Sequence, residues 1–320
     1  MKKILFLDTV HENLENGFKE LGWECIDGTD LDFLKVAKLL PDVHGIVIRS
    51  RFTLDACFLQ HATQLQFIAR SGAGMENIEE AYCKSRGILL FNAPEGNRQA
   101  VAEHAIGMLL SLFNNIVSGD IEVKAGKWDR EGNRGIELSE RTVGLIGYGN
   151  NGSATAKALS GFGCRILAYD KYKSGFGNEF VEEVSLEKLK EEIDVLSFHI
   201  PQTEETIGMF DEKFVNDFAN DFYLLNLSRG KVVQTSVLVN ALKSGKVLGA
   251  GLDVLEFEKT SFENFFDQNS DLPKDFQYLV SSDKVILSPH VGGWTTESYR
   301  KLSDVLLEKV KNALNNKALK

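Results

Sequence analysis

The sequence predicts an α/β protein with two parallel sheets. Short apolar segments alternate with amphipathic ones through most of the chain, a pattern typical of parallel strands joined by helices. A second series of the same kind begins near residue 142 and runs directly into a glycine-rich turn. The chain has 320 residues, 43% of them hydrophobic and 26% charged, so it is long enough for two domains with substantial cores.

The first hundred residues contain four apolar runs that we expect to be strands. They are Ile4–Asp8, Gly45–Ile48, Phe67–Ala69 and Ile88–Phe91. After Pro94 the pattern changes, and Val101–Ile116 predicts a long, largely apolar helix. Because this segment is too apolar for a simple surface helix, we expect it to pack between domains or between subunits.

The second series contains six strand-like runs, enough for a complete doubly wound sheet. They are Thr142–Gly147, Arg165–Asp170, Asp194–Ile200, Phe222–Leu227, Leu248–Val254 and Val285–Ser288. A last helix is predicted at about Thr296–Asn315, and we expect it to pack back on the first domain. The first domain would then be discontinuous, with residues 1–98 and the return segment 290–320, and a second domain at 99–289 would be inserted into it. The connection 258–284 is long, polar and aromatic.

Charge and composition exclude some classes of binding partner for this protein. The formal net charge of −10 argues against nucleic acid or an anionic membrane surface as a partner, since both select basic surfaces. No apolar run approaches the roughly 20 residues of a membrane span, and Ile4–Leu7 is too short for a signal peptide. The four cysteines form no CxxC pair, so we expect reduced thiols, no metal site and a cytoplasmic location.

The glycine-rich turn follows the strand expected at Thr142–Gly147 and precedes an alanine-rich helix. Its six residues are Gly147, Tyr148, Gly149, Asn150, Asn151 and Gly152. In the pattern GxGxxG, the first glycine permits a tight turn, the second lets the backbone approach a pyrophosphate, and the third allows close helix–strand packing. The helix N-terminus adds N–H donors for phosphate. The alternative is a glycine-rich turn with a structural role only.

Asp170 lies eighteen residues beyond Gly152, at the end of the next expected strand. A carboxylate at this place can bind the adenosine ribose and would repel a 2′-phosphate, which favours NAD over NADP as the cofactor. Lys171 and Lys173 follow it and oppose that preference. Asn151 replaces the apolar residue that is more usual before the third glycine.

Three segments that end later strands carry further polar residues. They contribute Arg229, then Asp253 and Glu258, then His290. Residues just beyond the carboxyl ends of parallel strands line the ligand crevice of an open sheet. An Arg can hold a carboxylate with two donors, a His can transfer a proton near neutrality, and a carboxylate can orient that His. Taken singly, each could instead be a surface ion pair, a structural histidine or a solvated acid.

Together with these segments, several ordered motifs resemble the D-isomer-specific 2-hydroxyacid dehydrogenases. The motifs are Gly72–Ile78, Ala100–His104, Trp128, Arg134–Gly135 and Ser197–Thr203. The resemblance covers nearly the whole chain and implies a substrate-binding role for Arg229 and an acid–base role for His290. In the family that this chain resembles, the partner of the histidine lies five residues after the aspartate. Counted from Asp253, this spacing implies Glu258, rather than Glu256, as the partner of His290.

The same resemblance implies further cofactor contacts. Asp253 would contact the nicotinamide carboxamide, and His199, Pro201 and Gly293 would line the cofactor cleft. A glutamate at position 258 is typical of the hydroxyacid enzymes, whereas formate dehydrogenases carry glutamine there. His104 is expected to be structural.

The first domain should supply the substrate contacts. By resemblance, Ala73 and Gly74 would offer backbone N–H groups to the substrate carboxylate, and Arg49 and Arg70 would add positive charge. Arg51 could join them or point away toward a surface carboxylate. These arginines resemble those of the D-3-phosphoglycerate dehydrogenases, here in a short form without a regulatory domain.

We therefore expect NAD-dependent oxidation of 3-phosphoglycerate to 3-phosphohydroxypyruvate, a step of serine biosynthesis, by a homodimer formed through the cofactor domain. The alternatives are a glyoxylate or hydroxypyruvate reductase and a D-lactate dehydrogenase. A protein of a different functional class is also an alternative, because the same fold is used by corepressors that sense NADH and bind peptides.

Overall fold

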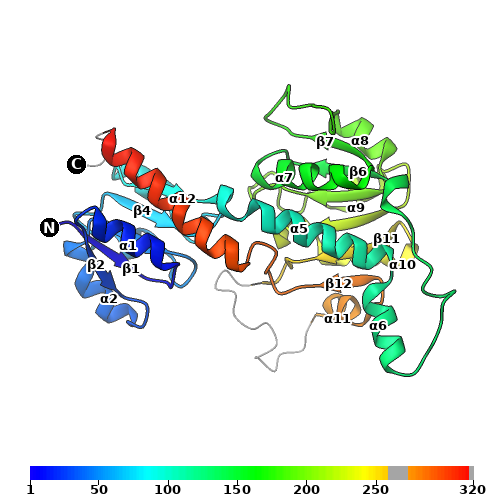
Figure 1. Cartoon of the computed structure of the whole chain (residues 1–320), viewed down its shortest axis with the longest axis horizontal. Coiled ribbons are helices and arrows are strands. Elements are labelled where there is room, and N and C mark those ends of the chain that lie inside the picture. The colour runs from blue at the N-terminus through cyan, green and yellow to red at the C-terminus, as the bar shows by residue number, and fades with distance from the viewer. Residues whose placement is uncertain (259–272, 317–320) are drawn as a thin grey trace. The chain divides into compact units, whose positions relative to one another are not determined.

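The computed structural model describes residues 1–258 and 273–316, which form two compact units (Figure 1). Unit 1 comprises residues 1–97 and 294–316, and unit 2 comprises residues 98–258 and 273–293. Each unit contains one sheet whose named strands pair in parallel, so the predicted α/β class with two parallel sheets is confirmed.

Unit 1 is built on a five-stranded sheet with the order β2-β1-β3-β4-β5. Its elements are β1 (Lys3–Phe6), α1 (Glu12–Glu20), β2 (Glu24–Asp27), α2 (Phe33–Leu39), η1 (Leu40–Asp42), β3 (Gly45–Ile48), α3 (Ala56–Leu59), β4 (Phe67–Arg70), α4 (Glu80–Ser85), β5 (Leu89–Asn92) and α12 (Thr296–Asn315). Only four of these strands are expected from the sequence. β2 differs from the others because it is an edge strand whose four residues include two acids and no run of apolar side chains.

Two hydrophobic cores cover the two faces of this sheet. Successive side chains of a strand point to opposite faces, so Ile4 belongs to one core and Leu5 to the other. The Ile4 core is completed by α1 and α12, whereas the Leu5 core is completed by α2, α3 and α4. Helix α12 thus returns the end of the chain to the sheet formed by its beginning.

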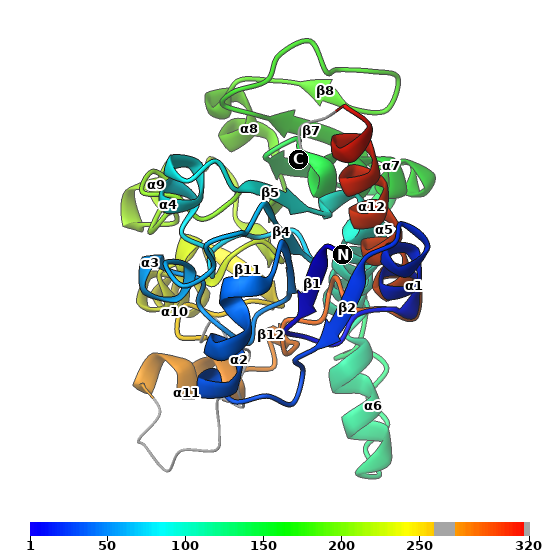
Figure 2. The same cartoon turned by 90° about the vertical axis from the view of Figure 1, so that its left-hand side faces the viewer.

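Helix α12 lies beside α1 (Figure 2). Asn13 Nδ2 donates a hydrogen bond of 2.8 Å to Asp304 Oδ1 across the pair. Gly17 makes room for Leu307, since a β-carbon at Gly17 would lie 2.1 Å from Leu307 Cδ2. The helix begins at a capping box in which Thr295 and Ser298 bond each other's backbone N–H groups.

Unit 2 is built on a seven-stranded sheet with the order β12-β11-β10-β9-β6-β7-β8. Its elements are α6 (Ile116–Lys124), η2 (Leu138–Glu140), β6 (Thr142–Ile146), α7 (Asn150–Leu159), η3 (Ser160–Phe162), β7 (Arg165–Tyr169), β8 (Glu182–Glu183), α8 (Leu186–Glu192), β9 (Val195–Phe198), α9 (Glu212–Asn216), β10 (Phe222–Asn226), η4 (Gly230–Val232), α10 (Thr235–Ser244), β11 (Val247–Leu252), α11 (Lys274–Ser281) and β12 (Val285–Leu287). Six of its strands are expected from the sequence; the seventh, β8, is a two-residue edge strand.

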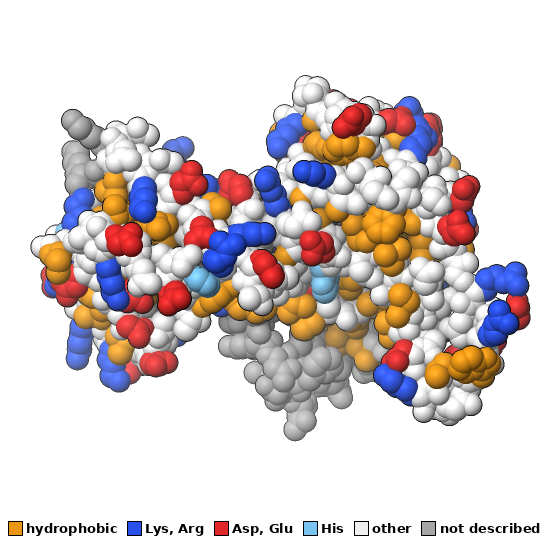
Figure 3. Space-filling model, in the orientation of Figure 1, with side chains coloured by type: hydrophobic (Ala, Val, Ile, Leu, Met, Phe, Trp, Pro, Cys, Tyr) orange, Lys and Arg blue, Asp and Glu red, His pale blue; other side chains and the backbone are white. Residues whose placement is uncertain are grey.

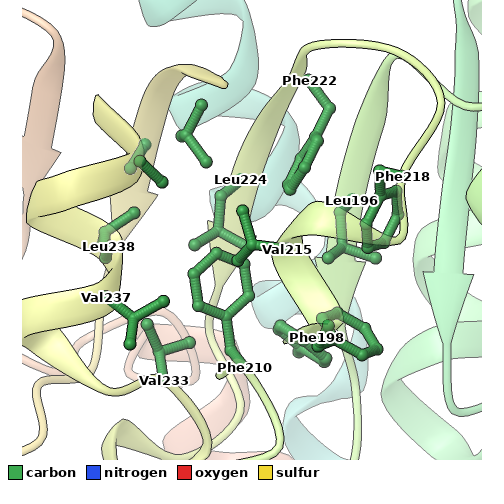
Figure 4. Packing of buried hydrophobic residues seen from close by; sticks show 14 of the residues in the cluster. Leu196, Phe198, Phe210, Val215, Phe218, Phe222, Leu224, Val233, Val237 and Leu238 are labelled. Atoms are coloured by element: carbon green, nitrogen blue, oxygen red, sulfur yellow. The ribbon is translucent and has the colours of Figure 1, made fainter. Parts of the chain in front are cut away.

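The strand order reverses beside β6. The chain passes outward from β6 through β7 to β8, and then crosses back to β9 and proceeds the other way to β12. Such a switch point opens a ligand crevice at the carboxyl ends of the two neighbouring strands, here β6 and β9. A phenylalanine-rich core fixes β9 and β10 beneath their covering helices, with Phe198, Phe210 and Phe222 buried in it (Figure 4).

The helix expected at 101–116 is longer and ends earlier. Helix α5 spans Pro94–Phe113, and after a break at Asn115, whose φ is 50°, the chain continues as α6 at an angle of 58°. From Arg98 on, α5 belongs to unit 2, and its apolar residues are buried in the core of that unit, among them Met108 and Phe113. The predicted single helix is therefore wrong in its bounds, and its apolar character serves the protein's own core.

Four exposed apolar side chains lie on α6. They are Ile116, Val117, Ile121 and Val123, each about half exposed or more. Hydrophobic side chains reach the surface where Figure 1 places α6 (Figure 3). Among the described helices, none alone is long and apolar enough to cross a membrane; α5 and α6 meet that criterion only as a bent pair.

Candidate active site

The glycine-rich turn connects β6 to α7 at the switch point. Gly147 has φ 95°, and a β-carbon there would lie 2.5 Å from the carbonyl oxygen of His199. A β-carbon at Gly152 would lie 2.1 Å from the carbonyl oxygen of Gly147. At Gly149, by contrast, no described atom lies within 4 Å of the β-carbon position. The turn is thus closed on two sides and open at Gly149, where the backbone can approach a pyrophosphate.

Asp170 fastens this turn to the end of β7. Its Oδ2 accepts a hydrogen bond of 2.7 Å from the backbone N–H of Tyr148, and its Oδ1 accepts from the backbone of Tyr172 and Lys173. A carboxylate has about four lone-pair positions, so one remains for a ribose hydroxyl. Asn150 begins α7, and the buried Oδ1 of Asn151 has no hydrogen-bond partner among the described residues.

The two lysines after Asp170 are engaged elsewhere. Lys171 forms an ion pair of 2.6 Å with Glu205, and Lys173 Nζ donates to the carbonyl oxygen of Tyr148. The carboxylate of Glu205 offsets the charge of Lys171, whereas Lys173 keeps its charge and lies against the backbone of the turn. The feature that suits the site to NAD is thus the acid at position 170.

His199 follows β9 on the other side of the switch point. Its backbone N–H donates to the carbonyl oxygen of Ile146, and its Nε2 lies 2.9 Å from Ser197 Oγ. Burial lowers the pKa of His199 to about 4, so the ring is neutral at physiological pH. Pro201 begins the next loop, where its carbonyl oxygen accepts from Thr206 Oγ1 at 2.7 Å.

Arg229 follows β10 in a tightly bonded loop. Asn226 Nδ2 donates to the carbonyl oxygen of Arg229 at 3.0 Å, and Arg229 Nη1 donates to the carbonyl oxygen of Ser228 at 2.6 Å. Next to it, a β-carbon at Gly230 would lie 1.9 Å from the carbonyl oxygen of Leu255. The loops after β10 and β11 are therefore in backbone contact.

His290 and Glu258 form a pair at the same edge of the sheet. Glu258 Oε2 lies 3.0 Å from Nδ1 of His290, and each side chain is about one quarter exposed. The other acid of this loop, Glu256, instead accepts from the backbone N–H of Thr235 at 2.8 Å. Because a carboxylate only accepts, Nδ1 of His290 carries the proton, and in this neutral tautomer Nε2 is the nitrogen that can accept one.

Asp253 holds the loop of His290. It is only 3% exposed, and its carboxylate accepts hydrogen bonds from Ser288 Oγ, Val291 N and Gly292 N. The resemblance assigns it a contact with the nicotinamide; in the described residues both of its oxygens already bind this loop. Gly293 follows Gly292 and is the last residue of the His290 loop that belongs to unit 2.

Unit 1 carries the predicted substrate residues. The guanidinium of Arg49 stacks on the ring of Trp294, with its carbon 3.9 Å from the ring centroid. Trp294 in turn meets the ring of Tyr299 edge-on at 5.3 Å. Asp8, which follows β1, accepts backbone hydrogen bonds from residues 49, 50 and 51. Burial lowers the pKa of Arg49, and Asp8 opposes that effect.

Arg51 has a structural role. Its guanidinium donates to the carbonyl oxygens of Leu7, Gly28 and Leu31, at 3.3, 2.8 and 2.6 Å. It therefore neither joins the substrate residues nor pairs with a surface carboxylate, the two possibilities that the sequence leaves open.

The remaining substrate candidates lie where β4 ends. Arg70 is its last residue, and its Nη1 would be 1.6 Å from a β-carbon at Gly72, so the guanidinium lies directly across this glycine. Ala73 and Gly74 follow, and Asn92 Nδ2 donates to the carbonyl oxygen of Ala73 at 2.7 Å.

The sequence predicts no role for Trp294 and only a structural one for His104. In unit 1 the ring of Trp294 stacks on Arg49, and in unit 2 His104 bonds Ser288 beside the loop of His290. The signal for Trp294 is its place four residues after His290. His104 has no such signal, because its partner is 184 residues away.

A glycine-rich turn at a switch point, an acid at the end of the next strand and a paired histidine at the same sheet edge define a dinucleotide-dependent oxidoreductase. The family model described as "D-isomer specific 2-hydroxyacid dehydrogenase, NAD binding domain" matches residues 106–292. The hydroxypyruvate reductase of Thermotoga maritima is 34% identical over 86% of this chain and 86% of that protein.

Two other proteins extend the comparison over nearly the whole chain. The D-3-phosphoglycerate dehydrogenase of Archaeoglobus fulgidus is 32% identical over 97% of this chain, which spans only 57% of that relative. The crystal structure of a D-lactate dehydrogenase from Aquifex aeolicus, complexed with NAD and lactic acid, has a TM-score of 0.83. It is 28% identical, and the superposition covers 99% of this chain and 96% of that one.

The chain belongs to the D-isomer-specific 2-hydroxyacid dehydrogenases. It is an oxidoreductase of that family, and its cofactor is NAD.

Proposed function

We propose that Arg229, Glu258 and His290 carry out the interconversion of a D-2-hydroxy acid and its 2-oxo acid. The observation that carries this assignment is the hydrogen bond between Glu258 and Nδ1 of His290 at the carboxyl edge of the unit 2 sheet. Bound NAD supplies the hydride acceptor for oxidation, and in its reduced form the hydride donor for reduction. The protein's own residues must bind the acid, orient it and move one proton.

The pair of Glu258 and His290 handles the proton. Glu258 fixes the tautomer with hydrogen on Nδ1, so Nε2 can take the proton of the substrate hydroxyl during oxidation. In reduction, the protonated ring returns that proton to the oxygen of the former carbonyl. Arg229 holds the substrate carboxylate through its two parallel N–H donors and polarises the neighbouring carbonyl.

The proposed substrate is 3-phosphoglycerate, with 3-phosphohydroxypyruvate as product, as in serine biosynthesis. Arg49 supports this choice. Among the described residues, no carboxylate forms an ion pair with its guanidinium, and the ring of Trp294 stacks on one face of its plane, so the N–H groups at the edges of that plane lie outside the stacking contact. A charged group of the substrate, such as a phosphate, is a suitable partner for those edges.

We also propose that the protein is a cytoplasmic homodimer formed through unit 2. The exposed apolar side chains of α6, such as Ile121, support an interface there. In a two-fold dimer the same surface of both copies would meet, which covers this face on each. The four free cysteines are compatible with a reducing compartment.

A four-acid panel tests the function. The purified chain is assayed with 3-phosphoglycerate, D-lactate, glyoxylate and hydroxypyruvate, each with NAD(H) and NADP(H). We expect turnover with NAD and a preference for the phosphorylated acid. His290→Gln should lower kcat by roughly 10²- to 10⁴-fold, the contribution typical of a positioned acid–base group. A fully active His290→Gln enzyme would refute the assignment of the proton to this residue.

The role of Arg49 needs a variant of its own. Arg49→Ala should raise the KM for 3-phosphoglycerate by roughly 10- to 100-fold, the loss expected for hydrogen bonds to a charged group. The KM for glyoxylate should hardly change. Arg86→Ala is the matched control, because Arg86 lies on the surface of unit 1 against Tyr82. Equal losses for all four acids would reject the phosphate site, and hydroxypyruvate or D-lactate as the best substrate would reject the proposed substrate.

A further inference from the structure

Three polar side chains form a continuous hydrogen-bond chain beside the loop that carries His290. They are His104 of α5, Ser288 after β12 and Asp253 after β11. Nε2 of His104 lies 2.9 Å from Oγ of Ser288, and this hydroxyl donates to Oδ1 of Asp253 at 2.5 Å. These hydrogen bonds thus link helix α5 to the buried carboxylate of Asp253, past the ends of two strands.

The direction of the hydrogen bonds follows from the chemistry of the three groups. An ionised carboxylate only accepts, so the single hydroxyl proton of Ser288 is used for Asp253. The oxygen of that hydroxyl must then accept, and its donor is Nε2–H of His104. Nε2 also lies 3.7 Å from Oδ1 of Asp253, close enough for a direct electrostatic interaction. Every donor in the chain therefore points toward Asp253.

Asp253 in turn anchors the backbone around His290. The N–H of His290 donates to the carbonyl oxygen of Asp253 at 2.8 Å. The next two N–H groups, of Val291 and Gly292, donate to the carboxylate at 2.9 and 2.8 Å. His290 itself has φ 55°, a left-handed conformation that is unfavourable for a residue with a β-carbon and persists only where its neighbours fix it.

We propose that His104 is a positioning residue for His290, acting through Ser288 and Asp253. The proposal rests on the proposed acid–base role of His290. Among the described residues, His104 is the only side chain that donates to Ser288 Oγ, so its loss leaves this oxygen without a donor and removes the nearby ring from Asp253. The carboxylate of Asp253 then holds the turn of His290 less rigidly.

The expected consequence is a loss of rate rather than of binding. Substrate is held by other groups, whereas proton transfer needs the ring of His290 in one orientation, and a displacement of about 1 Å can cost roughly 10²-fold in rate. His104→Leu should lower kcat by roughly 10- to 100-fold and change KM by less than about threefold. His104→Gln, whose amide places an N–H near the former Nε2, should restore most of the rate.

Ser288→Ala tests the route of the effect. It removes one hydroxyl oxygen and should lower kcat as much as His104→Leu does. The double variant should be no slower than either single variant, because all three break the same chain. Additive losses in the double variant would show that His104 does not act through Ser288.

The control is Glu103→Gln, a neighbouring exposed residue of α5 that bonds only Gln99 among the described residues. It should have normal kcat and KM. All variants are assayed as full chains with the most active acid of the panel, using NAD for a 2-hydroxy acid or NADH for a 2-oxo acid, and their thermal midpoints are measured in parallel. If His104→Leu lowers the midpoint but leaves kcat unchanged, His104 is merely structural and the proposal is overturned. An active His290→Gln enzyme would instead overturn the proposed function on which it rests.

Discussion

His199 shows how one side chain couples the cofactor crevice to pH. The residue sits beside the glycine-rich turn, and burial lowers the pKa of its ring to about 4. In the unfolded chain the same ring titrates near 6.5. At pH values between about 4 and 6.5 the ring is protonated in the unfolded chain but neutral in the folded protein. The contribution of His199 to stability is therefore fully present above about pH 6.5 and is lost as the pH falls toward 4.

His199→Gln should make the protein less sensitive to acid. Between pH 7 and pH 5 the wild-type protein should lose more free energy of unfolding than the variant, by on the order of 1–2 kcal/mol, because only the wild type has this histidine to protonate on unfolding. Urea unfolding at both pH values, without NAD, measures the difference. Equal losses in the two proteins would show that the ring is not kept neutral by the fold.

Some of the site could be predicted at the level of single residues, and some could not. The acid after β7, the arginine after β10 and the histidine after β12 follow from strand ends and chemistry. The choice of Glu258 over Glu256 needs family spacing, because both acids occupy the same loop. The role of Arg51 depends on three carbonyl oxygens whose positions no sequence pattern contains.

At the scale of elements, the first turn of α5 depends on a glycine. A β-carbon at Gly96 would lie 2.8 Å from the backbone N and Cα of Leu302, so α5 and α12 approach each other here without a side chain between them. Backbone atoms of a helix cannot give way as a flexible side chain can. Any larger residue at position 96 must push the two helices apart.

Gly96→Ala should therefore destabilise unit 1, by roughly 1–3 kcal/mol. Gly107 lies farther along the same helix, and no described atom lies within 4 Å of its β-carbon position. Gly107→Ala should have the opposite sign and stabilise the protein by about 0.5–1 kcal/mol, because alanine is the better helix former. Thermal melting of both variants provides the measurement. A change of the same sign in both would contradict the assigned helix contact.

The elements themselves differ in how well the sequence predicts them. Central strands are apolar runs and are found readily, whereas β2 and β8 are edge strands with half or more of their residues acidic. The end of α5 falls at Asn114 and Asn115, two polar residues that interrupt the apolar segment, and Asn115 has a φ of 50°. Asparagine tolerates this left-handed conformation, so the pair is the sequence signal that divides the segment into a buried helix and an exposed one.

At the scale of the whole molecule, the apolar face of α6 predicts self-association. Light scattering at micromolar concentration should give the mass of a dimer. Ile121→Glu, at a side chain that is 62% exposed, should raise the dimer dissociation constant by roughly tenfold or more, because each interface would then have to bury two charges. Leu34→Glu is the control, since Leu34 is also exposed but lies on α2 of unit 1. A monomeric wild-type protein would contradict the proposed interface.

The placement of α12 in the core of unit 1 also sets an order of events during synthesis. Leu302, Leu306 and Val310 complete the hydrophobic core next to β1, yet 210 residues separate Leu302 from Asn92 at the end of β5. At about 5–20 residues per second, the ribosome needs roughly 10–40 s to supply them. All strands of unit 2 emerge before α12, so the inserted unit can fold first. Throughout that interval the face of the first sheet that α12 covers is packed by α1 alone, so we expect apolar side chains there to stay exposed until α12 is synthesised.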